Sequence, residues 1–138
     1  MKNPTKSSLT NKLDKICSDI IRLNPCCNCS EPDRIKIQCA HIFSRSYRSV
    51  RWDLPNLLPL CASYHFYMHR NPVLFGEFVI THLGSAEYSE LKRKARKIYQ
   101  WKIFEMEDLL DHLKKEYQYR LVGLDIKNGL EKTNKVQV

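Results

Sequence analysis

The fold is decided by two cysteine-bearing segments, Cys26-Cys27-Asn28-Cys29 and Cys61-Ala62-Ser63-Tyr64-His65. The spacing Cys26-x-x-Cys29 lets two thiolates turn back onto one tetrahedral ion, and Cys61 offers a third thiolate. The N-terminal residues contain no apolar core of the kind that a secretory signal needs, so we expect reduced cysteines. Six cysteines in 138 residues then indicate a metal site rather than disulfides. We therefore expect a zinc knuckle held by Cys26, Cys29 and Cys61.

Hydrophobic periodicity predicts helices and strands around this knuckle. The N-terminal helix is expected to take its cap from Ser7, Ser8 or Thr10 and to end before Pro25, because the residue before proline leaves the helical region. A second break is expected at Gly84-Ser85. The elements expected are a helix over 8–23, turns over 25–34, strands over 35–42 and 57–60, and helices over 62–70, 73–82 and 86–121, the last with room for one bend.

These elements predict an α+β fold, in which a zinc-bearing core is packed between N- and C-terminal helices. The chain divides into four parts by its patterns. They are an N-terminal amphipathic helix over 1–24, a core over 25–82, a C-terminal helical extension over 83–124 and a flexible polar tail over 125–138.

Charge points to a polyanionic partner. Lys and Arg number 23 against 15 Asp and Glu, a net charge of +8, and nucleic acid is the first candidate for such a surface. Candidate phosphate contacts lie in a polar loop over 43–52 and in a basic helical run. They are Arg45, Arg48 and Arg51 in the loop, and Lys92, Arg93, Lys94, Arg96 and Lys97 in the run. The alternative interpretation of the helical run is a solvent-exposed helix face that binds nothing.

Histidines follow both cysteine segments. His65 and His69 lie four residues apart, so on a helix they face the same side and can share an ion. His41 lies at the end of the first expected strand, and Asn56 lies between the two histidine groups. Neutral imidazole is a suitable general base near pH 7.

The strings CCNC, CAHIFSR, RWDLPN and LCASYH together resemble the HNH endonuclease family, closest to small phage-type HNH proteins and the NinG/Rap recombination endonucleases. The resemblance extends over residues 9–90 and implies a ββα-metal finger as the core. It implies that His41 is the general base and that Asn56 fixes the loop and orients that base. It also implies that His65 and His69 hold a catalytic divalent ion, for which Mg²⁺, Mn²⁺ and Ni²⁺ are all suitable.

Two positions depart from the family pattern. Ala40 stands where the family often has a metal-binding Asp, His or Glu, and Tyr64 stands where a fourth zinc thiolate is usual. Cys27, Cys39 or His65 could complete the zinc site. For Cys39 we favour a place in the core over ligation, and Cys17 falls on the apolar side of the first helix.

The resemblance implies a metal-dependent endonuclease that nicks or cleaves duplex or branched DNA in phage-type recombination or packaging. The alternative is a non-catalytic, zinc-stabilised DNA-binding module that keeps a relict site. A third possibility is an interaction subunit of a phage replication, recombination or packaging complex, and the long C-terminal helix suggests a homodimer. We expect no membrane partner, since no apolar run approaches the ~20 residues that span a bilayer. The expected location is the cytoplasm of a bacterial host.

Overall fold

The computed structural model describes residues 2–29 and 36–136, with side chains described up to residue 131. Within these ranges the chain forms five α-helices and a two-stranded antiparallel sheet, so the α+β class is confirmed. In chain order the elements are α1 (Lys6–Ile21), β1 (Ile37–His41), a 3₁₀ turn η1 (Leu54–Asn56), β2 (Leu57–Cys61), α2 (Ala62–Arg70), α3 (Pro72–Leu83), α4 (Ser85–Ala95) and α5 (Ile103–Val136).

The two strands pair in antiparallel register, with Ile37 opposite Cys61 and His41 opposite Leu57. Helix α2 begins at the residue after Cys61, with no intervening loop. The register therefore places the start of β1 beside the third cysteine. It places His41 at the other end of the ladder, where the long loop over 42–56 begins.

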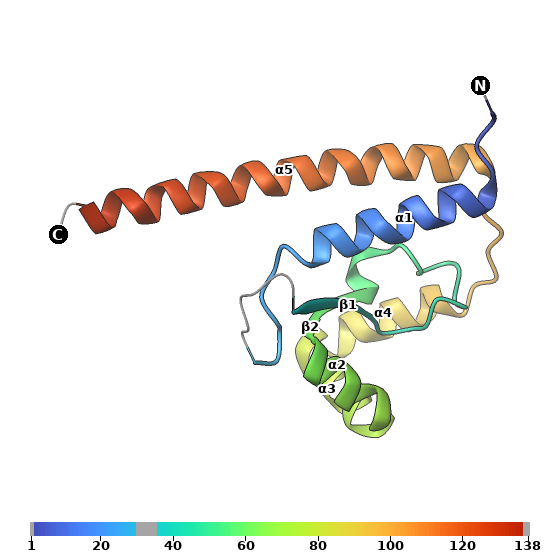
Figure 1. Cartoon of the computed structure of the whole chain (residues 1–138). Coiled ribbons are helices and arrows are strands. Elements are labelled where there is room, and N and C mark those ends of the chain that lie inside the picture. The colour runs from blue at the N-terminus through green and yellow to red at the C-terminus, as the bar shows by residue number, and fades with distance from the viewer. Residues whose placement is uncertain (1, 30–35, 137–138) are drawn as a thin grey trace.

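Side chains on the two faces of the sheet pack into two hydrophobic cores. Leu57 packs into a core with α1 and α5, whereas its neighbour Leu58 points to the opposite side and packs with α2 and α3, as successive side chains of a strand do. Helices α1 and α5 lie side by side and run in the same direction along one side of the molecule (Figure 1). The sheet is thus held between this helix pair and the shorter helices.

Helix α1 begins earlier than its apolar pattern indicates. Thr5 is the N-cap: its hydroxyl accepts from the backbone N–H of Ser8, and the Ser8 hydroxyl accepts from the backbone N–H of Thr5. This reciprocal capping box satisfies two backbone donors at the helix start. The expectation of a cap at Ser7, Ser8 or Thr10 was wrong, because the apolar stripe locates the buried face of a helix and not its first residue.

The C-terminal half differs from the expected single helix over 86–121. Helix α4 ends at Ala95, and α5 begins at Ile103, so a non-helical connection replaces the expected bend. Trp101 in this connection donates its indole N–H to the Arg48 carbonyl at 2.9 Å and packs edge-on against Trp52 at 5.3 Å. These distant contacts hold the connection out of a helix. Over the described residues, no helix combines the length and apolar character needed to cross a bilayer.

The polar segment over 125–138, expected to be a flexible tail, is helical as far as Val136, and 137–138 lie outside the described residues. Helix α5 extends well past the end of α1 (Figure 1). The segment contains several good helix formers. The expectation failed because it treated the loss of apolar periodicity as the end of the helix.

Asp14 on α1 ties the helix pair to the loop over 42–56. Its carboxylate accepts from Nε and Nη2 of Arg51, at 3.0 and 2.7 Å, and from the indole N–H of Trp52 at 2.8 Å. Burial works against the charged carboxylate, but the hydrogen bonds from Arg51 and Trp52 outweigh it and lower the pKa of Asp14. Asp14 thus binds two loop residues at once and fixes how the loop sits on α1.

We predict that Asp14→Asn destabilises the protein by about 2 kcal/mol at pH 7, the usual range for a hydrogen bond to a charged group. A lowered pKa in the folded state stabilises above the unfolded-state value and loses that effect as pH falls through the folded-state value. The stability difference between wild type and Asp14→Asn, measured by urea unfolding, should therefore shrink from pH 7 to pH 3. Asp111→Asn, at an exposed position of α5, is the control. A difference that stays constant with pH would contradict the assignment.

Candidate metal centre and histidine pocket

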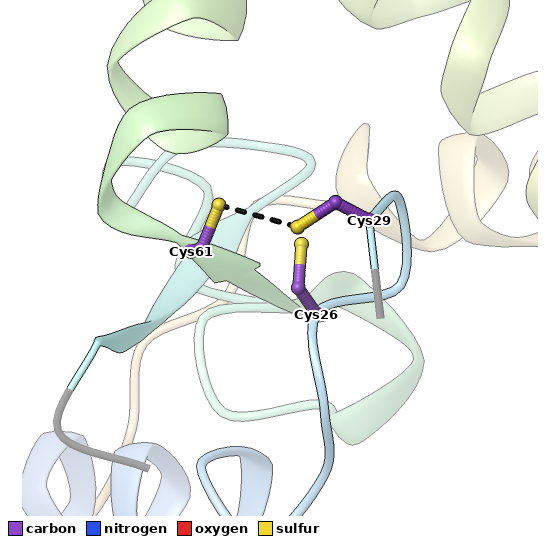
Figure 2. A group of neighbouring side chains, drawn as sticks. All are labelled: Cys26, Cys29 and Cys61. Carbon is purple, nitrogen blue, oxygen red and sulfur yellow. Dashed lines mark hydrogen bonds between the residues drawn. The ribbon is translucent and has the colours of Figure 1, made fainter. Parts of the chain in front are cut away.

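The three predicted zinc thiols lie together. Cys26 and Cys29 belong to the turn that follows α1, and Cys61 ends β2; their sulfurs point toward one another (Figure 2). All three sulfurs lie within 4.8 Å of one another, and the Cys29 and Cys61 Sγ atoms are 3.6 Å apart. Tetrahedral Zn–S bonds of about 2.3 Å separate ligand sulfurs by roughly 3.8 Å. The thiol geometry therefore fits one structural metal ion such as zinc.

Backbone contacts hold the thiols in this arrangement. The backbone N–H of Cys27 donates to the Pro59 carbonyl at 2.9 Å, which attaches the turn to β2. Burial tends to raise the pKa of Cys26, but hydrogen bonds from the backbones of Cys61, Cys29 and Asn28 outweigh it, and its pKa is lowered. Donors directed at a sulfur favour its thiolate form, which is the metal ligand.

The residues considered as a fourth ligand lie elsewhere. Among the described residues, Cys26, Cys29 and Cys61 form the sole group of three or more His, Cys, Asp or Glu close enough to share an ion. Burial raises the pKa of Cys27 and of Cys39 to about 11, and Cys39 packs against the α1–α5 core, as we predicted. Cys17 is buried in the same core, as expected, with its pKa raised to about 12 by burial. Tyr64 is exposed.

The histidine predicted as the base and the two predicted as metal ligands line one small cavity of about 180 Å³. His41 enters it from the end of β1, and His65 and His69 enter it from α2. The rings of His65 and His69 have centroids 5.2 Å apart, because the two residues lie one helical turn apart. The other lining residues are Ala40, Ile42, Ser44, Met68, Pro72 and Phe75.

Gln38 orients the first of the paired histidines, a role the sequence reasoning missed. Its amide oxygen lies 2.7 Å from Nδ1 of His65. An amide oxygen only accepts, so Nδ1 carries the proton and Nε2 keeps its lone pair. A metal-binding histidine usually donates its other ring N–H to such an acceptor. The role of Gln38 could be found only from the pairing of the two strands, which places Gln38 opposite Leu60.

Burial and nearby charges lower the pKa of two histidines in the pocket, His41 and His65. Burial lowers the pKa of His41, and the charge of Arg45 lowers it further, against a hydrogen bond with the Arg51 backbone that raises it. Burial and the neighbouring His69 lower the pKa of His65. Both imidazoles therefore have free lone pairs at pH 7, as a base and a metal ligand require.

Asn56 fixes the loop that follows His41. It is fully buried, and its side-chain oxygen accepts from the Phe43 backbone N–H at 2.8 Å. Its amide group donates to the carbonyls of Phe43 and Val50, at 3.0 and 3.1 Å. Its own carbonyl accepts from the Ile42 N–H at 2.9 Å. Asn56, at the end of the loop, thus holds the start and the middle of the loop and sets the backbone beside His41.

Comparison of the chain with protein-family models, curated proteins and solved structures finds no match. The assignment of a function therefore depends on the chemistry of these residues. The cysteine cluster and the histidine pocket are joined through α2, which starts at Cys61 and carries His65 and His69.

The predicted phosphate contacts fall into two groups. Arg45 and Arg48 are exposed on the loop, and Lys92, Arg96 and Lys97 are exposed on or just after α4. Arg51, in contrast, binds Asp14, and Arg93 pairs with Glu90. Lys94 lies 3.4 Å from Asp53. Arg51 thus has an ion-pair partner within the chain, which its position in a basic loop did not indicate.

We predict that Cys29→Ser loses stoichiometric zinc and lowers the melting temperature by many degrees, because metal-binding free energy contributes to folding in small metal domains. Cys27→Ser is the matched control: it changes the adjacent thiol, which lies outside the trio. Zinc is measured by elemental analysis of the purified proteins. A Cys29→Ser protein that retains one zinc per chain would sink the assignment.

Asn56→Ala should destabilise the protein by about 3 kcal/mol, because it leaves the part-buried N–H and carbonyl of Phe43 without their partner and removes one of the two hydrogen bonds to the Val50 carbonyl. Asn56→Asp keeps the acceptor for Phe43 but loses both donors, so most of the loss should remain. Asn128→Ala, at an exposed position of α5, is the control for urea unfolding. Equal stabilities for Asn56→Ala and the control would refute the loop assignment.

Proposed function

We propose that the protein is a metal-dependent DNA endonuclease of the HNH type, with β1, β2 and α2 as a ββα-metal finger. The observation that carries the proposal is the convergence of His41, His65 and His69 on one cavity. These residues come from two elements, and their placement follows the order that the HNH resemblance implies.

His41 is the proposed general base. Its lowered pKa keeps the imidazole neutral at pH 7, so it can take a proton from the attacking water. Asn56 is a positioning residue, because its hydrogen bonds to Phe43 and Val50 fix the loop that begins after His41. Burial of the Asn56 side chain keeps this arrangement rigid.

His65 and His69 are the proposed ligands of the catalytic ion, with Mg²⁺, Mn²⁺ and Ni²⁺ as the candidates. The imidazole pair fits a divalent ion, since Gln38 fixes the proton on Nδ1 of His65 and leaves Nε2 available. A divalent ion bound there would supply charge stabilisation for the scissile phosphate and the leaving 3′ oxygen. The structural zinc is assigned to Cys26, Cys29 and Cys61.

DNA is the proposed partner, on the grounds of net charge and exposed basic residues. The chain carries a net charge of +8. The exposed Arg45 lies four residues beyond His41 along the chain, and its charge lowers the pKa of His41, so a phosphate bound by Arg45 would lie near the pocket. Phosphate contacts of this kind position a duplex without reading its sequence.

A non-catalytic DNA-binding module is the second candidate, and Ala40 favours it. Ala40 is 1% exposed and lines the pocket, so this position supplies no ligand beside the histidine pair. Water molecules would then complete the coordination of an ion. The two candidates differ in one property, the hydrolysis of DNA.

We predict that the purified protein nicks supercoiled plasmid when Mg²⁺, Mn²⁺ or Ni²⁺ is added, and that His41→Ala lowers the rate by at least 10²-fold, the usual contribution of a general base. His112→Ala, an exposed histidine on α5, is the matched control and should nick at the wild-type rate. Nicking is followed by conversion of supercoiled to open-circular DNA on agarose gels.

Two results would contradict the proposal. Equal nicking by wild type and His41→Ala would show a contaminating nuclease. Absence of nicking with every metal, together with intact DNA binding, would establish the second candidate.

A further inference from the structure

Hydrogen bonds from Ser49 and Trp101 join the loop over 42–56 to α4 and to the connection that follows it. The Ser49 hydroxyl donates to the Lys94 carbonyl at 2.7 Å, and the Trp101 indole donates to the Arg48 carbonyl at 2.9 Å. Between these two segments lies a surface hollow of about 370 Å³. Ligand pockets typically have volumes of ~300–1,000 Å³, so this hollow has the size of a binding site.

Basic side chains on both walls give the hollow a positive charge. Arg48 comes from the loop, and Arg96 and Lys97 follow α4. Among the described residues, none of these three forms an ion pair, whereas the neighbouring Arg93 and Lys94 are paired with Glu90 and Asp53. The three cations are therefore available to an external anion, and Arg binds phosphate groups through paired, charge-assisted hydrogen bonds.

Aromatic rings line the same hollow. Tyr47 is 44% exposed and rests edge-on against Phe43 at 5.5 Å. Tyr99 is 40% exposed and rests edge-on against Trp101 at 5.0 Å, and its hydroxyl donates to Glu105 at 2.8 Å. Both rings are thus held in place and still present surface to solvent.

A second hollow of about 340 Å³ adjoins the first, and the two share Lys97 and Tyr99. Its lining is mainly apolar, with Trp52 and Trp101, and Lys94 stands beside them. Ile98 lies between the shared residues, and its side chain is 96% exposed. Two cations, an exposed aliphatic side chain and one exposed ring therefore follow one another along the chain segment after α4, as Arg96, Lys97, Ile98 and Tyr99.

We propose that these adjoining hollows bind a single-stranded stretch of DNA, with bases stacked on Tyr47 and Tyr99 and phosphates on Arg48, Arg96 and Lys97. Basic grooves with stacking aromatics are the general means of binding single strands. Paired bases lie within the duplex stack, so a duplex would use the cations without the rings. The inference depends on the proposed function, because it names the form of DNA, a branched or partly single-stranded substrate, that the nuclease would take.

Fluorescence anisotropy tests the inference with a fluorescein-labelled oligothymidylate of about twelve nucleotides, a length that one single-strand module covers. A blunt hairpin duplex of the same total length is the comparison ligand. Binding is measured without added divalent ions and without chelator, so the zinc-loaded protein stays intact and no cleavage step contributes. Binding to the oligothymidylate is therefore independent of nuclease activity.

We predict that Tyr47→Ala weakens binding of the oligothymidylate by about tenfold, with little effect on the hairpin, and that Tyr47→Phe binds as wild type because it keeps the ring. Arg96→Ala should weaken oligothymidylate binding and reduce its log–log salt slope by about 0.7. Lys127→Ala, an exposed lysine on α5, is the matched control and should change neither property. Thermal melting of each variant confirms that it is folded.

Unchanged oligothymidylate binding by folded Tyr47→Ala would overturn the inference. Equal losses for hairpin and oligothymidylate would also overturn it, because they indicate a duplex backbone contact. Failure of plasmid nicking with the single-strand effects intact would refute the proposed nuclease and leave the binding site established.

Discussion

The close approach of Cys26, Cys29 and Cys61 is the constraint on which the rest of the structure depends. Cys29 and Cys61 are separated by 32 positions, and their sulfurs lie 3.6 Å apart. Cys61 is also the last residue of β2 and the residue before α2. An ion bound by the three thiolates would therefore fix where α2 starts. The positions of His65 and His69 on that helix follow from its starting point.

Hydrogen-bonded polar side chains, buried or partly buried, place the other half of the histidine pocket. The loop over 42–56 has no regular structure before its final 3₁₀ turn, so its shape comes from side chains that hold its backbone. Asn56, at the end of this loop, binds Phe43 near its start and Val50 in its middle, and Asp14 holds Arg51 and Trp52 against α1. A buried group of this kind is costly to leave unpaired. These hydrogen bonds thus fix the backbone of the loop that follows His41 and, with it, the position of the His41 side chain.

Local patterns predicted much of this arrangement. Cysteine spacing predicted the thiol cluster, and the i, i+4 spacing of His65 and His69 predicted one shared face. The Thr5 cap and the helical segment over 125–136 were missed although they are local, whereas the features missed around the site depend on residues distant in sequence. The helix break after Ala95 follows from the contact of Trp101 with Arg48, and Arg51 was assigned to DNA because nothing local indicated its pairing with Asp14. Gln38 was overlooked for the same reason, since only strand pairing brings it to His65.

Anomalous X-ray scattering from crystals of the zinc-loaded protein soaked in Mn²⁺ tests the two-metal arrangement most directly. Data collected at the zinc and manganese absorption edges locate each ion separately. We predict a zinc peak among Cys26, Cys29 and Cys61 and a separate manganese peak beside His65 and His69, within reach of His41. Zinc bound elsewhere, or a histidine pocket that takes no manganese, would contradict the account.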